Sequence, residues 1–197
     1  MKAIREGFRK KIVIAEPKPE DAREIEELFY RTWLETYPNK EAGVTRDDVE
    51  DKYKSSFSDE MLAKRAERIA QPPDGDTLLL AKEGKKIVGL CRVVVHQDKN
   101  QLQAIYVLPE YQSRGVGSLL WKEAQKHFDV RRDIVVHVAT YNTKAVAFYK
   151  KLGFEDTGLR FKEERFTMKS GATIPEMEMR IHVQPQDTKQ NPKNGSM

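Results

Sequence analysis

The spacing of apolar residues divides the chain into a first part that is mainly helical and a second part that is rich in strands. From Glu20 to Pro38, apolar residues recur at intervals of three and four, which predicts an amphipathic helix. After the break at 72–75, short apolar runs bounded by turn residues predict strands. The other expected helices are 47–53, 59–70, 115–128 and 142–152. The expected strands are 11–15, 77–82, 86–95, 102–107, 133–139, 154–168 and 172–183.

This order of elements predicts a mixed sheet flanked by helices, in the α/β (α+β) class. The strands at 77–82 and 86–95 are separated by a short turn and should form a hairpin. The strands at 102–107 and 133–139 are joined through a helix, and this connection is long enough for a right-handed crossover. We therefore expect these two strands to be parallel.

The two ends of the chain lack the patterning of the middle. Residues 1–11 are basic and poorly patterned, which predicts an N-terminal extension. Residues 184–197 consist of Pro, Gln, Lys and Asn with almost nothing apolar, which predicts a disordered tail. One domain is expected between them, over 12–183.

Composition narrows the possible partners. The chain has 35 basic and 31 acidic residues, and the formal net charge of +4 is too small and too dispersed to indicate nucleic-acid binding, although it suits an anionic cofactor. No apolar run has the length of a membrane span, and the N-terminus lacks the apolar core of a signal peptide. We expect a cytoplasmic protein without a nucleic-acid or membrane partner.

The chain has a single cysteine, Cys91, so an intrachain disulfide is excluded. Cys91 ends the apolar run that begins at Ile87, inside an expected strand. A buried and unreactive thiol fits this position better than a nucleophile does. A covalent intermediate on Cys91 is therefore not expected.

The loop Gln112-Ser113-Arg114-Gly115-Val116-Gly117 follows one strand and opens a helix. A helix N-terminus presents free N–H groups and a partial positive charge, and glycines let a ligand approach the backbone. These features suit a pyrophosphate, with Arg114 adding charge at the rim. The loop lacks the Gly-Lys-Ser/Thr of a P-loop and the third glycine of a dinucleotide fingerprint. Taken alone, it fits an anion site or a plain turn.

A second segment follows one strand later and contains Asn142, Phe148-Tyr149 and Gly153-Phe154. The pair of segments resembles the GCN5-related N-acetyltransferase (GNAT) family. The first family signature is Gln/Arg-x-x-Gly-x-Gly/Ala after a strand that ends in Val-x-Pro. The second is Asn with a small residue, then Phe-Tyr and Gly-Phe. Both occur here in the family's order, and the resemblance covers about 78–179.

The resemblance implies the GNAT fold, with a central mixed and mostly antiparallel sheet, one splayed parallel strand pair and flanking helices. It implies an acetyl-CoA-dependent N-acetyltransferase that works by direct transfer in a ternary complex, without a metal ion. The acceptor is expected to be a primary amine on a small molecule or peptide, and the protein a monomer or homodimer. Two alternatives stay open: a non-catalytic acyl-CoA-binding or regulatory module, and an acyltransferase for a longer acyl chain.

The resemblance also assigns the donor site. The pantetheine arm is expected along the first splayed strand and the pyrophosphate at the loop. Asn142 would contact the cofactor arm, or cap the helix that follows, or do both. The expected cofactor-binding residues are Ile105, Tyr106, Val107, Gln112, Ser113, Arg114, Gly115, Val116, Gly117, Ser118, Asn142 and Tyr149.

For catalysis, Tyr149 matches the family's general acid, which protonates the departing thiolate. His137 stands where the ribosomal-protein-alanine acetyltransferases have a Glu, and it is either the general base or a packed strand residue. A water chain to a Glu is a third possibility. At the end of the first helix, Trp33, Glu35 and Tyr37 are expected to bind a cationic amine, in a pattern similar to that of PaiA-type polyamine acetyltransferases, or to pack as an ordinary helix end.

Overall fold

The computed structural model describes residues 11–183. The predicted tail at 184–197 and residues 1–10 of the predicted N-terminal extension lie outside the described residues. Among the described residues, no helix combines the length and the apolar character needed to cross a bilayer.

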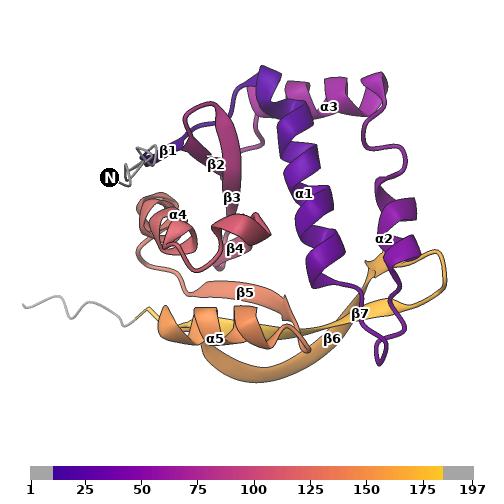
Figure 1. The fold of residues 1–197 in the computed structure, drawn as a ribbon. Coiled ribbons are helices and arrows are strands. Elements are labelled where there is room, and N and C mark those ends of the chain that lie inside the picture. Colours follow the sequence, from indigo (N-terminus) through magenta and orange to yellow (C-terminus); the bar gives the residue numbers. More distant parts are fainter. Residues whose placement is uncertain (1–10, 184–197) are drawn as a thin grey trace, which may run out of the picture.

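Seven strands form one sheet in the order β1-β2-β3-β4-β5-β7-β6 (Figure 1). All neighbouring strands are antiparallel except β4 and β5, which are parallel. The predicted hairpin, the parallel pair and the fold class are therefore confirmed. The strands are β1 Ile12–Ala15, β2 Asp76–Glu83, β3 Lys86–Val95, β4 Asn100–Val107, β5 Ile134–Ala139, β6 Glu155–Thr167 and β7 Thr173–Ile181.

The helices lie near the predicted ranges. They are α1 Ala22–Thr36, α2 Arg46–Tyr53, α3 Asp59–Ala70, α4 Val116–Ala124 and α5 Thr143–Lys151, with short 3-10 turns at Pro19–Asp21, Pro109–Tyr111 and Gln125–His127. The predicted helix at 115–128 is thus shorter, because its last turn tightens into a 3-10 turn before Phe128 becomes extended.

The sheet separates α4 from α1, as consecutive residues of β4 show (Figure 1). Ile105 faces α4, since its Cγ2 lies 3.9 Å from the position of a Cβ on Gly117. Tyr106 faces the other way and meets the ring of Phe29 on α1 edge-on, with centroids 5.7 Å apart. Side chains alternate across a strand, so helices α1 and α4 cover opposite faces of the sheet. The end of β4 can therefore pack side chains against the helices on both faces of the sheet and still present its backbone edge to a ligand.

The parallel strands β4 and β5 separate soon after they meet. Within the described sheet they pair only over the first two residues of each strand. On the other side of β4, the register with β3 shifts beside Arg92, and Gln103 has no partner there. Such a bulge bends a strand and increases its twist, which turns the rest of β4 away from β5. This is the splayed pair that the sequence predicted.

We expect Gly89→Ala to lower the free energy of unfolding by about 1–3 kcal/mol, because it overpacks the contact between β3 and α4. A Cβ on Gly89 would lie 3.0 Å from the carbonyl oxygen of Tyr106 and 3.2 Å from side-chain carbons of Val116 and Leu120. Urea denaturation measures the change. The control is Val130→Ala at a side chain that is 77% exposed, where a change within about 0.5 kcal/mol is expected. An unchanged urea midpoint for Gly89→Ala would show that the contact between β3 and α4 accommodates an added methyl group.

Candidate active site

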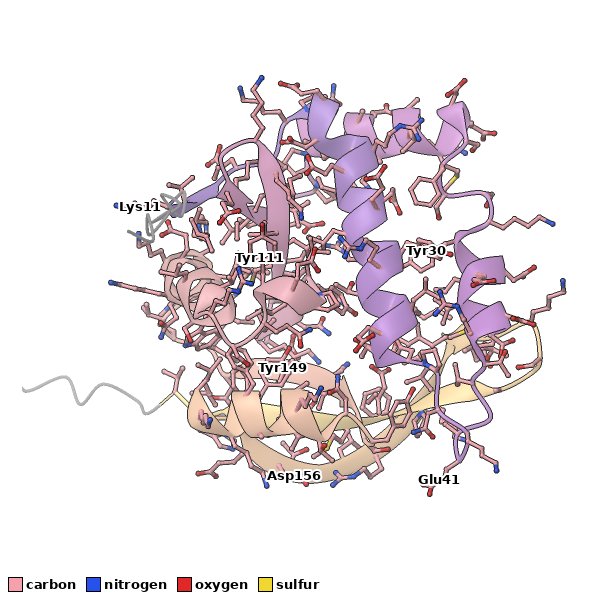
Figure 2. All side chains as sticks on the ribbon, viewed as in Figure 1. Lys11, Tyr30, Glu41, Tyr111, Tyr149 and Asp156 are labelled. Atoms are coloured by element: carbon pink, nitrogen blue, oxygen red, sulfur yellow. The ribbon has the colours of Figure 1, made fainter. Side chains whose placement is uncertain are left out.

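A cavity of about 750 Å³ opens where β4 and β5 separate. Its walls come from the end of α1, the end of β4, the loop and first turn of α4, the end of β5 and most of α5. Tyr111, in the turn before α4, and Tyr149, on α5, both line it (Figure 2). Segments far apart in the sequence thus contribute to one elongated site.

The loop before α4 presents backbone N–H groups to this cavity. Ser113 has a φ of 58° and Gly115 a φ of 82°, so the chain enters the left-handed region twice before the helix begins. The N–H of Leu119 bonds to the carbonyl of Gly115 at 3.0 Å. The N–H groups of the three residues before Leu119 therefore belong to the first turn, where a helix offers no partner of its own. Together with the helix dipole, these groups could hold an anion.

Two side chains of the loop, Gln112 and Arg114, contact the residues that precede the loop. The Gln112 amide donates to the carbonyl of Val107 at 3.2 Å, which ties the loop to the end of β4. The guanidinium of Arg114 stacks 5.0 Å above the ring centroid of Tyr111, whose hydroxyl donates to Glu83 at 2.7 Å. The cavity wall includes Gln112 and Tyr111 but not Arg114, so the charge of Arg114 sits beside the cavity.

Asn142 caps α5. Its side-chain oxygen accepts a hydrogen bond from the N–H of Ala145 at 3.1 Å. The residue also lines the cavity, next to Thr143. The capping role is therefore present, and the position leaves room for a contact with a bound ligand as well.

Tyr149 is only 6% exposed and lines the cavity. Burial raises the pKa of its phenol, and the nearby Tyr106 and Cys91 add to the effect. A raised pKa keeps the phenol protonated across the neutral range, as a proton donor requires. Cys91 itself is fully buried, and burial raises the pKa of its thiol too, so a thiolate nucleophile is disfavoured there.

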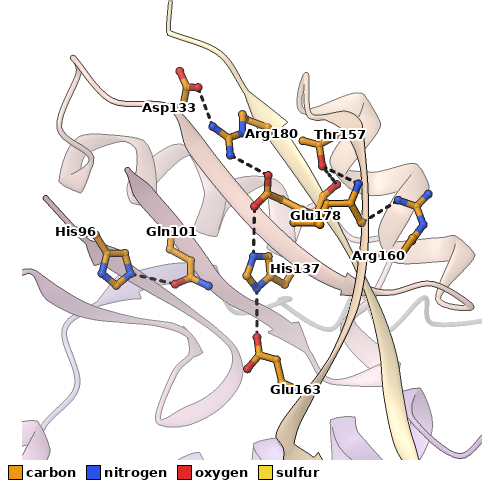
Figure 3. A network of polar contacts seen from close by, with 10 residues as sticks. His96, Gln101, Asp133, His137, Thr157, Arg160, Glu163, Glu178 and Arg180 are labelled. Atoms are coloured by element: carbon orange, nitrogen blue, oxygen red, sulfur yellow. Dashed lines mark hydrogen bonds and ion pairs between the residues drawn. The ribbon is translucent and has the colours of Figure 1, made fainter. Parts of the chain in front are cut away.

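His137 also lines the cavity, and it lies between two carboxylates (Figure 3). Its Nδ1 is 3.5 Å from Glu163 and its Nε2 is 3.7 Å from Glu178. The buried Nδ1 has no hydrogen-bond partner. Burial lowers the pKa of His137, although both carboxylates act in the opposite direction. At neutral pH the ring is therefore mainly neutral, with each nitrogen turned toward a carboxylate.

The far end of the cavity is aromatic. Glu35 and Tyr37 at the end of α1 line it, as the sequence suggested. The hydroxyls of Tyr37 and Tyr106 are 2.8 Å apart, and the hydroxyl of Tyr141 donates to the carbonyl of Tyr37 at 2.9 Å. Trp33 is not part of the wall: it is 6% exposed and stacks behind Tyr37, with ring centroids 4.2 Å apart. Its role in the structure is packing.

Sequence reasoning missed Glu176 on β7. The residue is 7% exposed, and its Oε2 has no hydrogen-bond partner. Burial, helped by the charge on Glu163, raises the pKa of the Glu176 carboxyl to about 7. A signal was present in the strand pattern: Ile174, Glu176 and Glu178 alternate with Met177 and Met179, so carboxylates had to point to one face of a strand whose other face is apolar.

The family model described as "Acetyltransferase (GNAT) family" matches residues 23–154. The chain belongs to this family. Among relatives, this GNAT protein is 27% identical to a probable N-acetyltransferase of Mycobacterium tuberculosis, over 87% of this chain and 94% of that one. It is 30% identical to a putative [ribosomal protein bS18]-alanine N-acetyltransferase of Bacillus subtilis, over 54% of this chain and 66% of that one.

Solved structures agree on the GNAT fold. The PaiA N-acetyltransferase of Thermoplasma acidophilum, in complex with coenzyme A, matches with a TM-score of 0.64 at 21% identity, covering 87% of this chain and 99% of that one. The putative acetyltransferase yncA of Salmonella typhimurium, with acetyl-CoA, matches with a TM-score of 0.54 at 18% identity, covering 89% and 96%. At these identities the likeness concerns the fold.

We expect Glu176→Gln to stabilise the GNAT domain more at pH 8 than at pH 5. The folded-state pKa of Glu176, about 7, lies above its ordinary value, so the native state loses stability as the pH rises from the ordinary value to 7. Removing the charge should restore on the order of 1–3 kcal/mol at pH 8, after allowance for solvent screening. Urea denaturation at both pH values measures this. Equal gains at both would show that the carboxyl does not titrate in this range.

Asn142→Ala should lower the free energy of unfolding by about 1 kcal/mol, because α5 loses its cap. Asn142→Asp keeps an oxygen acceptor and should retain the stability. Coenzyme A binding, measured by calorimetry on both variants, separates the two roles. Weaker binding by the stable Asp variant would show a contact with the cofactor, whereas unchanged binding by both would leave capping as the whole role.

Proposed function

We propose that this chain is an acetyl-CoA-dependent N-acetyltransferase that moves an acetyl group to a primary amine by direct attack in a ternary complex. One observation carries the proposal: a single cavity joins an anion-binding loop, the gap between β4 and β5, a buried tyrosine and an aromatic, acidic end. Family membership supports acetyl transfer, and the relatives named as N-acetyltransferases support an amine acceptor.

The residues present suit the acetyl donor. The N–H groups of Val116, Gly117 and Ser118 lie at the positive end of α4, where they would hold the pyrophosphate. The edge of β4 at 105–107 has no partner in β5, so backbone groups that β3 does not pair are available to the pantetheine arm, apart from the Val107 carbonyl, which accepts from Gln112. Two solved structures of this fold contain coenzyme A or acetyl-CoA, which supports the same donor here.

The donor supplies a thioester that is activated toward nucleophiles, and the protein supplies the proton transfers. We assign Tyr149 as the donor of a proton to the departing sulfur, because its buried phenol stays protonated and lines the cavity. His137 remains a candidate base from its position on β5. However, both of its nitrogens already face carboxylates, which makes it a poor acceptor for a third group.

A cationic primary amine fits the far end of the cavity. Glu35 lines this end, and tyrosine rings form its wall. Carboxylates attract an ammonium group, and aromatic faces stabilise a cation that has lost part of its hydration. The Bacillus subtilis relative is named for acetylating an alanine of a ribosomal protein, which supports amines on peptides as well as on small molecules.

We expect Tyr149→Phe to lower kcat by about 10²-fold, because the departing thiolate loses its proton donor. The KM for acetyl-CoA should change by less than about threefold, since the phenol is assigned to the chemical step and not to donor binding. The measurement is thiol release from acetyl-CoA with a panel of amines.

The matched control is Tyr30→Phe, because Tyr30 packs against Tyr53 and Phe57 and does not line the cavity. It should retain turnover within about twofold. Full activity of Tyr149→Phe would remove Tyr149 from the mechanism but leave the activity standing. A wild-type protein that binds coenzyme A yet releases no thiol with any amine would instead identify a non-catalytic binding module.

A further inference from the structure

We propose that Glu176 is the catalytic base, which binds the ammonium group of the acceptor and takes its proton; this assignment rests on the proposed function. Glu176 lies on β7 opposite Ala139 of β5, which is part of the cavity wall. On its other side it lies opposite Phe161 of β6. Glu176 is not itself one of the residues that line the cavity; it lies on the neighbouring strand, directly beside a residue that does.

The charge of Glu176 reaches three tyrosines at the far end of the cavity. It raises the pKa values of Tyr37, Tyr106 and Tyr141. All three also line the cavity. Tyr106 in turn raises the pKa of Tyr149. Tyr149 on α5 and Ala139, the strand neighbour of Glu176, therefore line the same cavity.

Within residues 11–183, no basic side chain forms an ion pair with Glu176, although the charge of Arg165 reaches it. Its neighbours on the same face are matched: Glu178 accepts from Arg180 at 2.9 Å, and Glu163 pairs with Arg165. The Oε2 of Glu176 has no hydrogen-bond partner, and a buried carboxylate in that state is costly. A cation that arrives with the substrate would satisfy it, and an ammonium group among aromatic rings has the right charge and size.

The groups that face Glu176 set its ionisation. Glu163 on β6 raises its pKa and Arg165 on the same strand lowers it, while burial dominates and brings the pKa to about 7. The tyrosines on α1, β4 and the end of β5 are neutral in this range, because burial raises their pKa values. A carboxyl poised near neutral pH is a better match to an amine than an ordinary Glu, whose pKa is about 4.3.

The reaction balances as follows. The ammonium group gives one proton to the Glu176 carboxylate, and the freed lone pair attacks the thioester carbon. A C–N bond forms and the C–S bond breaks. The amine nitrogen then loses a second proton, which restores the phenol of Tyr149 after Tyr149 has given its own proton to the departing thiolate. Glu176 finally releases its proton to solvent, so each turnover yields an amide, a thiol and one proton.

The test compares wild type, Glu176→Gln, His137→Gln and the exposed control Glu155→Gln by thiol release between pH 6 and 9.5. The acceptors are spermidine, free lysine, a lysine-containing peptide and a peptide with a free N-terminus. For wild type, kcat/KM should rise up to about pH 7 and then level off, because ionised Glu176 takes over deprotonation of the amine. In Glu176→Gln, kcat/KM should be about 10²-fold lower at pH 7.5 and should keep rising with pH toward the pKa of the amine.

Glu155→Gln should match wild type, because Glu155 is an exposed residue at the start of β6. In His137→Gln, kcat/KM should still level off near pH 7. The proposal is overturned if Glu176→Gln keeps the wild-type profile, or if the levelling disappears in His137→Gln instead. The stability curve of Glu176→Gln confirms that the variant is folded.

If wild type releases no thiol with any acceptor, the proposed acetyl transfer is wrong, and the role of Glu176 is then tested by amine binding. The same four amines are then titrated calorimetrically into protein saturated with coenzyme A. Wild-type binding that Glu176→Gln weakens by about tenfold or more supports an ammonium site at Glu176. Equal binding by the two proteins, or no binding by wild type, overturns it.

Discussion

The separation of β4 from β5 is the constraint on which the rest of the site depends. At the closed end, the buried side chain of Asn100 donates to the carbonyls of Asp129 and Arg132 at 2.8 Å and accepts from the N–H of Asp129 at 2.9 Å. This holds the incoming chain of β5 against β4. At the open end, the bulge at Gln103 bends β4 away. A fixed closed end and a bent open end leave backbone groups unpaired in the middle of an otherwise continuous sheet, a situation that only a ligand or water relieves.

The chemistry of the cavity follows from what covers this gap. Its donor half is built almost entirely from backbone: the first turn of α4 and the free edge of β4. The end proposed for the acceptor is built from side chains that three distant segments contribute, including Tyr37, Tyr106 and Tyr141. Backbone recognition tolerates changes of side chain, whereas side-chain recognition does not. If the proposed function holds, this division lets the donor be bound through the backbone while the acceptor meets an arrangement of tyrosines particular to this chain.

Several features were predictable from sequence because they depend on local physics. The alternation of apolar residues placed all seven strands and five helices within a few residues of their observed bounds. Asn142 was readable as a cap, since an Asn before a helical run satisfies free N–H groups. The surroundings of His137 were not readable, because its partners Glu163 and Glu178 come from strands 26 and 41 residues later in the chain. The same distance concealed Glu176, and the left-handed Ser113 has no marker in residue type.

The sequence by itself determined the order of elements, the crossover between β4 and β5, the helix start that attracts an anion, and the resemblance that named the donor. These depend on periodicity and on short motifs, which act within one or two elements. Only the tertiary structure decided which side chains share the acceptor end, that Trp33 packs behind Tyr37 and that a buried carboxylate lacks a partner. Burial and electrostatic coupling are properties of strands brought together from far apart in the chain, and no local pattern specifies them.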